Sequence, residues 1–443
     1  MANSYLTHTT STPTNNDKCT ISFWTKFSNV GSDLGVFSQH TDSNNRIQLA
    51  RLTSGALSLF QKVSSTIEIS ITTNRLFRDV SAWYHVVIAF DTTQSTASDR
   101  VKFYVNGVQE TSFSVSTYPS QNTDIRFNSS SLSQEIGRIT ADTYMDGYMS
   151  HVAFVDGQAL APTVFGETDS TSGIWKFKSP SGVTWGTNGF HLKMENSAAL
   201  GTDSSGNSNT FTVNGNLKQA LDTPSNVYAT GNPLFVKLGT WSNGNNSIVG
   251  STSTNVRPQM WSTLGAKTGK FYAEAKYTDK TGGMVGVSDY TATNTIINAG
   301  TYQGNAVGSW GFWNDGSKYD NGQGSSSYGS AWNTNDIIQI ALDLDNEFVY
   351  FGINGTWQNG GNPASGASGT YGLALTNTRD EHWFMSWGDG SQGNSATCHV
   401  NYGNGYFATT AVSSAGSNAS GNGIFEYDVP TGYTALSTKG LNL

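Results

Sequence analysis

The side chains best suited to chemistry in this sequence are aromatic and polar residues in glycine-rich loops of the second half. Indole and phenol rings stack on the apolar face of a sugar, and nearby amide or carboxylate groups hydrogen-bond its hydroxyls. Alternation along residues 310–313 means that at most one of the two tryptophans there is buried on a given face, and core packing is the alternative for any single residue. We predict a site for a glycan or protein partner among Trp310, Trp313, Asn314, Asp315, Tyr319, Asp320, Tyr328, Trp332 and Trp357.

Three carboxylates, those of Asp343, Asp345 and Glu347, stand at alternate positions, a spacing that places side chains on one face of a strand. A retaining glycosidase needs two carboxyl groups roughly 5–5.5 Å apart, so a polysaccharide hydrolase is one alternative. The pair Asp345-Asn346, however, separates two apolar runs and predicts a hairpin turn, with Glu347 opening the next strand. The three carboxylates then do not share a strand, and we predict a protein that is not an enzyme and has no catalytic residue.

Other catalytic and metal-binding patterns are weak. The sequence has no G-x-S-x-G, H-E-x-x-H or C-x-x-C motif, and its seven histidines are scattered; His85, in an apolar run, is interpreted as a core or edge histidine. Glu68, Glu110 and Glu135 show no pairing by spacing that would support a hydrolase in the first half. The oxygen-rich loop 202–207 suits a structural Ca²⁺, with Asp203 and Asn207 as candidate ligands and a self-capped Asx turn as the alternative. No other cofactor is expected.

Composition narrows the class of protein. Among 443 residues only 13% are charged, 12% are aromatic and 49 are glycine, which is typical of short packed strands joined by polar turns. The net charge of −8, without a Lys/Arg cluster, argues against a nucleic-acid partner. No apolar run has the length of a membrane helix, and the first residues do not resemble a secretory signal, so we expect neither membrane insertion nor export by that route. The two cysteines, Cys19 and Cys398, are interpreted as free thiols, with a bridge between them as the alternative.

The pattern along the chain is that of β-strands, and helical periodicity is almost absent. One short helix or helical turn is expected over residues 159–167. Two strands end in Asn-Gly, at VKFYVNG (101–107) and VYFGING (349–355), and each pair predicts a type I′ hairpin turn because both residues tolerate positive φ. The run WYHVVIAF (83–90) is too apolar for one wet face and predicts a central strand. We expect an all-β protein of two antiparallel β-sandwich (jelly-roll) domains in tandem, over 1–225 and 260–443, with a linker and first strands at 226–259.

Ordered sets of strand motifs carry two resemblances. ISFWTKFS, AWYHVVIAFD, VKFYVNG, IGR (136–138) and MDGYMSHVAFVDGQAL resemble the laminin G-like branch of the concanavalin A-like jelly rolls over about residues 1–225. GKFYAEAKYT, MVGVSD, WGFWNDGSKYDNG, DIIQIALDLDNEFVYFGINGTW and WFMSWGDGS resemble a SPRY domain over roughly 260–395. The first fold hosts sugar binders, enzymes and structural modules, and the second implies a binding module that presents loops from one end of a sandwich.

The combination of the two halves resembles virion surface proteins of marine bacteriophages, of the tail-fibre or head-decoration type. That resemblance implies location on a particle surface, contacts with other virion proteins, homo-oligomerisation, and binding of a host-surface glycan or protein. A polysaccharide hydrolase and a purely structural protein without ligand remain the alternatives.

Overall fold

The computed structural model describes residues 3–235, 239–251, 257–376 and 379–443. The chain divides into two compact units, Met1–Gln219 with Thr223–Ser225, and Ala220–Asp222 with Asn226–Leu443. We call these units the first and the second module. The prediction of an all-β protein with two antiparallel β-sandwiches in tandem is confirmed.

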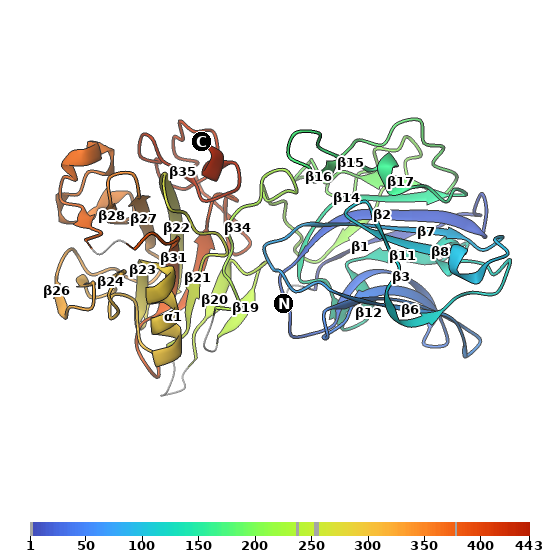
Figure 1. Ribbon diagram of the computed structural model, residues 1–443, viewed down its shortest axis with the longest axis horizontal. Helices are drawn as coiled ribbons and strands as arrows, with labels where there is room; N and C mark the ends of the chain where they lie inside the picture. Colours follow the sequence, from blue (N-terminus) through green and yellow to red (C-terminus); the bar gives the residue numbers. More distant parts are fainter. Residues whose placement is uncertain (1–2, 236–238, 252–256, 377–378) are drawn as a thin grey trace. The chain divides into compact units, whose positions relative to one another are not determined.

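The first module contains a sheet of eight strands and a sheet of six (Figure 1). The eight-stranded sheet has the order β10 (Phe113–Thr117), β6 (Thr66–Leu76), β5 (Ala56–Val63), β4 (Asn45–Arg51), β3 (Leu34–Asp42), β11 (Ser133–Ile136), β1 (Tyr5–Thr9), β18 (Thr212–Asn214). The six-stranded sheet has the order β17 (Phe190–Leu192), β14 (Gly147–Asp156), β2 (Lys18–Phe27), β7 (Tyr84–Asp91), β8 (Val101–Val105), β9 (Val108–Glu110). Two small hairpins add β12 (Arg138–Thr140) with β13 (Thr143–Tyr144), and β15 (Gly166–Thr168) with β16 (Trp175–Phe177).

The second module pairs a sheet of nine strands with a sheet of six. The path of the larger sheet is β19 (Thr240–Ser242), β20 (Ser247–Val249), β32 (Thr397–Asn401), β22 (Lys270–Asp279), β27 (Ile337–Asp343), β28 (Phe348–Ile353), β29 (Thr356–Trp357), with β30 (Leu373–Ala374) beside β28 and β35 (Thr434–Ala435) parallel to β22. The smaller sheet has the order β21 (Gln259–Trp261), β31 (Trp383–Asp389), β23 (Gly283–Asp289), β24 (Ser309–Trp313), β25 (Ser317–Asp320), β26 (Ser325–Ser327). A short hairpin joins β33 (Tyr406–Phe407) and β34 (Thr410–Ala411).

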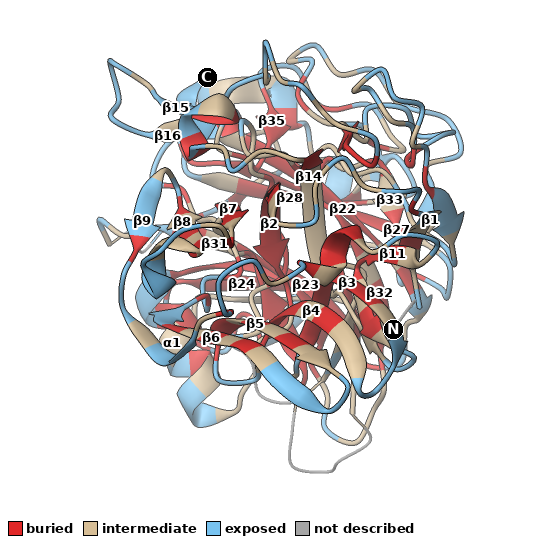
Figure 2. Cartoon of the chain, turned by 90° about the vertical axis from the view of Figure 1, so that its right-hand side faces the viewer, coloured by how far each residue is buried: buried red, intermediate tan, exposed pale blue. Residues whose placement is uncertain are grey.

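Each module buries a core between its two sheets. Figure 2 shows in red that many of the strands consist of buried residues. In the first module the central strand β7 sends Val86, Ile88 and Phe90 into that core, because alternate side chains of a strand share a face. Its other face is buried too: Val87 lies in a second apolar cluster with Ala153, Val155 and Phe165. The prediction that residues 83–90 form a central strand without a wet face is therefore confirmed by burial on both sides.

Additional segments cover the outer faces of three sheets. Residues 157–189, which we call the strap, connect β14 to β17 and pack on the outer face of the six-stranded sheet of the first module. In the second module the segment after β32, residues 402–443, is called the tail, and its Phe425, Val429 and Tyr433 pack on Tyr272 and Tyr350 of the nine-stranded sheet. The helix α1 (Tyr290–Ala299) packs on Trp261 of the six-stranded sheet.

Both Asn-Gly pairs form the predicted two-residue turns. Asn106 and Gly107 have φ values of 48° and 80°, and Val105 pairs with Val108 on either side of the turn. Asn354 and Gly355 have φ values of 48° and 82° between β28 and β29. Positive φ at both central residues is the signature of a type I′ turn, so this prediction is confirmed.

Helix is scarce in the described part of the chain, as expected, but the sequence did not predict α1. Asp289 caps its first turn by accepting the Ala292 N–H, and Gly300 ends it with a left-handed φ of 63°. The missed signals were these two caps; the interior TATNT run is rich in residues that are poor helix formers. At 159–167 the structure has one 3₁₀ turn, Pro162–Val164, in line with the expected short helical turn. Further 3₁₀ turns occupy Ala97–Asp99, Arg126–Asn128, Gln358–Gly360, Pro363–Ser368 and Gly440–Asn442.

Two further expectations concern the cysteines and membrane-spanning helices. Cys19 and Cys398 are both free and buried, so the alternative of a bridge between them is wrong. Within the described ranges, no helix has the length and apolar character needed to cross a membrane.

Candidate ligand-binding site

Three half-buried aromatic rings form a compact group on the outer face of the six-stranded sheet of the second module. Along β24, Trp310 and Phe312 point into the core, which leaves Gly311 and Trp313 on the opposite face. Tyr319 lies opposite Gly311 on β25, and its ring centroid is 5.1 Å from that of Trp313. Tyr302 completes the group, with its ring centroid 5.5 Å from Trp313 and 5.1 Å from Tyr319. The rings meet at tilted or edge-on angles, the usual arrangement of aromatic clusters.

The loop that supplies Tyr302 rests on two glycines of the sheet. A Cβ added at Gly286 would lie 2.2 Å from Cγ of Gln303, and one at Gly311 would lie 2.7 Å from the Gln303 carbonyl oxygen. Only glycine therefore lets this segment approach the strands so closely. Gln303 is fully buried, and neither of its side-chain amide atoms has a hydrogen-bond partner in the described part of the chain; the same holds for Nε1 of Trp313.

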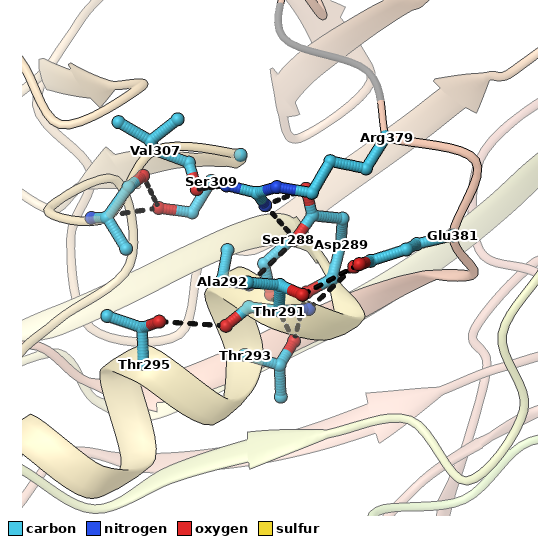
Figure 3. A network of polar contacts seen from close by, with 12 residues as sticks. Ser288, Asp289, Thr291, Ala292, Thr293, Thr295, Val307, Ser309, Arg379 and Glu381 are labelled. Carbon is cyan, nitrogen blue, oxygen red and sulfur yellow. Dashed lines mark hydrogen bonds and ion pairs between the residues drawn. The ribbon is translucent and has the colours of Figure 1, made fainter.

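A polar network holds the loop in place (Figure 3). Asp289 is fully buried and accepts two hydrogen bonds from Nη1 of Arg379, at 2.8 and 2.6 Å, while Nη2 of Arg379 donates to the Val307 carbonyl. Burial raises the pKa of Asp289, and the Ala292 N–H and the Arg379 guanidinium partly offset that effect. Glu381 accepts from the N–H and the hydroxyl of Thr291 at the first turn of α1. The helix start and the loop after it are thus fixed to one another.

The nine predicted residues divide into a buried and a surface group. Trp310, Tyr328 and Trp332 are in the core, with exposed fractions of 2%, 5% and 0%, so the prediction that they contact a ligand is wrong. Each follows the inward alternation of its strand or packs on Phe312. Trp357 lies in strand β29 rather than in a loop, and it is half-buried against Tyr272 with ring centroids 6.3 Å apart.

The remaining predicted residues surround the aromatic group. Asn314 donates its side-chain N–H to the Lys280 carbonyl, which leaves its amide oxygen directed elsewhere. Exposed Asp315 accepts the Ser317 N–H in an Asx turn, and Asp320 pairs with Lys318 two residues before it. Tyr302 was not predicted, although it shares the signal that identified the others, an aromatic residue flanked by glycines in a polar loop.

The acidic triplet forms a turn. Strand β27 ends at Asp343 and β28 begins at Phe348, so the predicted hairpin turn at Asp345-Asn346 is confirmed, although Glu347 belongs to the turn and not to the next strand. Asp343 is buried; it accepts from Lys270 Nζ at 2.8 Å and from the Asn346 backbone N–H. The carboxylate of Asp345 caps the Gly269 N–H. These contacts give two of the three carboxylates structural roles.

His85 and Ser22 are in hydrogen-bond contact in the first module, but their geometry is not that of a catalytic pair. The Trp175 Nε1–H donates to Nδ1 of His85 at 2.9 Å, which places the histidine proton on Nε2. Nε2 therefore donates to Ser22 Oγ, 2.9 Å away, and has no lone pair to accept the serine proton. Both residues are buried, and burial lowers the pKa of His85 to about 3.

The three glutamates considered for a hydrolase in the first module are apart from one another and bound to other groups. Glu110 pairs with Arg75, Glu135 with Arg138, and Glu68 accepts from Gln61. They come from β9, β11 and β6 respectively.

The side chains of Asp203 and Asn207 are both engaged in hydrogen bonds within the protein. Asp203 accepts hydrogen bonds from the N–H groups of His191, Ser205 and Asn209, and Asn207 donates its side-chain N–H to the carbonyls of Gly186 and Gly189. No group of three or more His, Cys, Asp or Glu residues arranged for a metal occurs among the residues that the structure describes. The contacts therefore favour the Asx turn over Asp203 and Asn207 as ligands.

We accordingly expect the melting temperature of the protein to be the same with and without a chelator such as EDTA. The carboxylate of Asp203 already accepts three backbone N–H groups, and an ion would have to displace them. Differential scanning calorimetry measures this directly. A fall of more than about 3 °C with EDTA, restored by added Ca²⁺, would contradict the expectation.

A concavity lies beside the Asp289 network, apart from the aromatic group. It has a volume of about 250 Å³ and is lined by Lys267, Leu344, Glu347, Leu375, Arg379, Asp380, Glu381 and Trp383. Both of its cations are paired, Lys267 with Asp380 at 3.0 Å and Arg379 with Asp289, and the lining also contains the carboxylates of Glu347 and Glu381. Trp383 is buried and turned into the core, so this concavity lacks an exposed ring on which a sugar could stack.

Two family comparisons agree with this geometry. The concanavalin A-like lectin/glucanases superfamily matches residues 1–164, and the SPRY domain family matches residues 270–371. The chain carries a concanavalin A-like domain and a SPRY domain. The SPRY match contains Tyr302, Trp313 and Tyr319 but ends before the tail, and the concanavalin A-like match ends before β15 and β16 of the strap.

Solved structures similar to parts of the chain have low identities. The SPRY domain of human HERC1 is 15% identical, covers 38% of this chain and 96% of its own, and has a TM-score of 0.29. A heptameric SAP-like pentraxin from Limulus polyphemus is 16% identical over 48% of this chain and 86% of its own, with a TM-score of 0.31. Stonustoxin is 16% identical over 39% of this chain and 27% of its own, with a TM-score of 0.29. No curated protein matches the chain.

Proposed function

We propose that the protein is a non-enzymatic binding and adhesion protein whose SPRY domain binds a neutral glycan at the Tyr302, Trp313 and Tyr319 group. The observation that carries the proposal is this group of three half-buried rings, with centroids within 5.5 Å of one another, on a sheet face beside the loop that the Asp289 network holds. Sugar rings offer an apolar C–H face to such rings. Asn314 and exposed Asp315 follow Trp313 directly and supply amide and carboxylate groups for hydroxyls.

The types of the two domains and the contacts of their carboxylates support binding rather than catalysis. Concanavalin A-like and SPRY domains are β-sandwiches of the kind that present loops and sheet faces to ligands, which suits an adhesion module. The carboxylates considered for hydrolysis form turns or ion pairs, and His85 is oriented as a donor to Ser22. We therefore assign no catalytic residue.

The test is binding of the full chain to a glycan array, followed by titration calorimetry with the best oligosaccharide. We expect Trp313→Ala to weaken binding by about tenfold or more, because loss of a stacking aromatic removes about 1.5 kcal/mol or more. Tyr290→Ala is the matched control, since Tyr290 is an aromatic residue of α1 with 48% of its surface exposed, outside the group. Equal affinity of both variants and the parent protein would contradict the proposed site, and the absence of any glycan ligand would contradict the glycan class.

Placement on a bacteriophage particle stays a prediction that follows from the resemblance of the combined sequence. It includes contacts with other virion proteins and a homo-oligomeric state on the particle surface. Antibodies raised against the protein should label intact particles in electron micrographs, and failure to label them would contradict this placement.

A further inference from the structure

The strap covers the outer face of the six-stranded sheet in the concanavalin A-like domain. Its Phe165 joins Val87, Ala153 and Val155 in a buried apolar cluster, and several half-buried strap residues pack around them. Figure 1 shows β15 and β16, the hairpin of the strap, near β14, and Phe177 of β16 stacks on His151 of β14. The strap thus covers an apolar sheet face, although most of its own residues are polar and many are exposed.

Three aromatic side chains of the strap each stack on one histidine of the sheet. The histidines come from three different strands, β7, β14 and β17, and all three lie under the strap. The pairs, with ring-centroid distances and interplanar angles, are Trp175 on His85 (6.0 Å, 19°), Phe177 on His151 (3.6 Å, 12°) and Trp185 on His191 (5.8 Å, 16°). The strap is therefore attached through groups that change charge in mildly acidic solution.

Protonation would break the best-defined of these attachments. His85 accepts the Trp175 indole proton at Nδ1, which is the atom that gains a proton when the ring becomes cationic. Two donors would then face each other across 2.9 Å. His151 and His191 have ring centroids 5.6 Å apart, so their simultaneous protonation adds a repulsion between like charges.

Few of the charged groups around the three histidine rings would stabilise the protonated histidines while the strap is attached. Lys193 lies close enough to disfavour the cationic form of both His151 and His191, and His151 acts in the same sense on His85. Asp203 and Glu195 oppose this effect at His191 alone. The charged side chains of the strap make other contacts: Lys176 pairs with Asp169 and Glu167, and Lys178 donates to the Thr163 carbonyl.

We infer that the strap is an acid-released clasp: protonation of His85, His151 and His191 detaches residues 157–189 from the sheet while the core between the two sheets stays folded. The inference is independent of the glycan site, which lies in the other module. Release of the strap exposes an apolar and aromatic sheet face. This face is therefore accessible in acidic solution and covered at neutral pH.

The direction follows from proton binding in the two states. Burial lowers the pKa of His85 to about 3 and those of His151 and His191 to about 4, whereas a histidine in solvent has a pKa near 6.5. Above about pH 6.5 all three rings are neutral with the strap on or off, so acidity has no effect there. As the pH falls from about 6.5 towards 4, the released state binds more protons, and the equilibrium shifts towards release by up to about tenfold per pH unit for each histidine.

Hydrogen exchange followed by mass spectrometry tests the inference on the intact protein. After correction for the intrinsic exchange rate, opening of the strap amides at Trp175–Phe177 should increase at least about 100-fold between pH 7 and about pH 4.5. Amides of β7 should keep their protection over the same range, because the core stays closed. The double variant His151→Asn/His191→Phe removes two titrating rings, and asparagine suits the positive φ of 49° at position 151.

The slope of strap opening against pH decides the outcome. We expect it to fall from about three protons in the parent protein to about one in the double variant, whatever the level of opening at neutral pH. His40→Phe, at a histidine of the eight-stranded sheet, is the control and should leave the slope unchanged. The inference is overturned if the parent strap opens equally at both pH values, if the double variant keeps the parent slope, or if strap and β7 lose protection together.

Discussion

Glu274→Ala is expected to destabilise the second module by about 3 kcal/mol. Glu274 is fully buried on β22, and its carboxylate accepts the backbone N–H groups of Glu426 and Tyr427 and the hydroxyl of Tyr272, at 2.8–2.9 Å. Alanine would leave two tail N–H groups and one hydroxyl without an acceptor in a buried place, and each such group costs about 1–3 kcal/mol. Urea denaturation at about pH 6 measures the loss.

The same carboxylate makes stability depend on pH in a defined direction. Burial raises the pKa of Glu274 to about 7, against an ordinary value of 4.5, so the folded module holds the proton more tightly than the unfolded chain. Proton binding by Glu274 therefore adds up to about 3 kcal/mol to the free energy of unfolding. This addition is complete below about pH 4.5 and is lost as the pH rises towards 7. Asp389, whose pKa burial also raises to about 7, contributes in the same window.

Glu274→Gln separates the charge from the hydrogen bonds. In this variant the free energy of unfolding should lose the part of its pH dependence between about pH 4.5 and 7 that is due to Glu274. The part due to Asp389 should remain. The control is Glu347→Gln, a change at an exposed carboxylate of the same module. An unchanged pH profile in Glu274→Gln, or a loss below about 1 kcal/mol in Glu274→Ala, would show that this carboxylate does not hold the tail.

Gly107→Ala is expected to destabilise the first module by about 3 kcal/mol. The φ of Gly107 is 80°, a left-handed conformation that costs about 1–2 kcal/mol for an L side chain. An added Cβ would also lie 2.5 Å from the Trp175 ring, and overpacking of this kind costs about 1–3 kcal/mol more. The change should loosen the strap as well as the turn, which hydrogen exchange of Trp175–Phe177 would show.

A matched control separates the two causes. Gly173 lies in the turn of the strap hairpin with a φ of 72°, and an added Cβ there meets no atom within 4 Å. Gly173→Ala therefore carries only the backbone strain and should cost about 1–2 kcal/mol. Equal losses in the two variants, measured by urea denaturation, would mean that contact with Trp175 does not constrain Gly107.

Local patterns predicted the strands and turns well because their causes are local. Asn and Gly both tolerate positive φ, so an Asn-Gly pair between two strand patterns predicts a tight turn from local sequence alone. The turn at 344–347 likewise follows from polar residues between two apolar runs. Helix α1 was missed because its evidence lies in the caps Asp289 and Gly300, while most of the residues between them are poor helix formers.

The candidate site was harder to predict because burial depends on tertiary contacts. Alternation correctly separates Trp310 from Trp313, but nothing near Trp332 reveals that it packs on Phe312 from a distant strand. The strap and the tail have isolated aromatic residues in polar sequence, so they carry no periodic signal of their own. The sequence of β7 indicates instead that another segment covers the outer face of its sheet, because β7 has apolar residues on both faces.

Each of these two Asn-Gly turns packs against an aromatic ring from a segment that is distant in sequence. Gly107 lies against Trp175 of the strap, and an added Cβ at Gly355 would lie 2.7 Å from the ring of Tyr427 in the tail. Both aromatic residues come from segments beyond the matched family regions, which end at residues 164 and 371. The region that matches a family model is therefore shorter, in each half, than the compact unit that contains it. A recombinant fragment that stops at a family boundary would leave an apolar sheet face bare, whereas one extended to residue 219, or begun at 220 and carried to 443, retains its own cover.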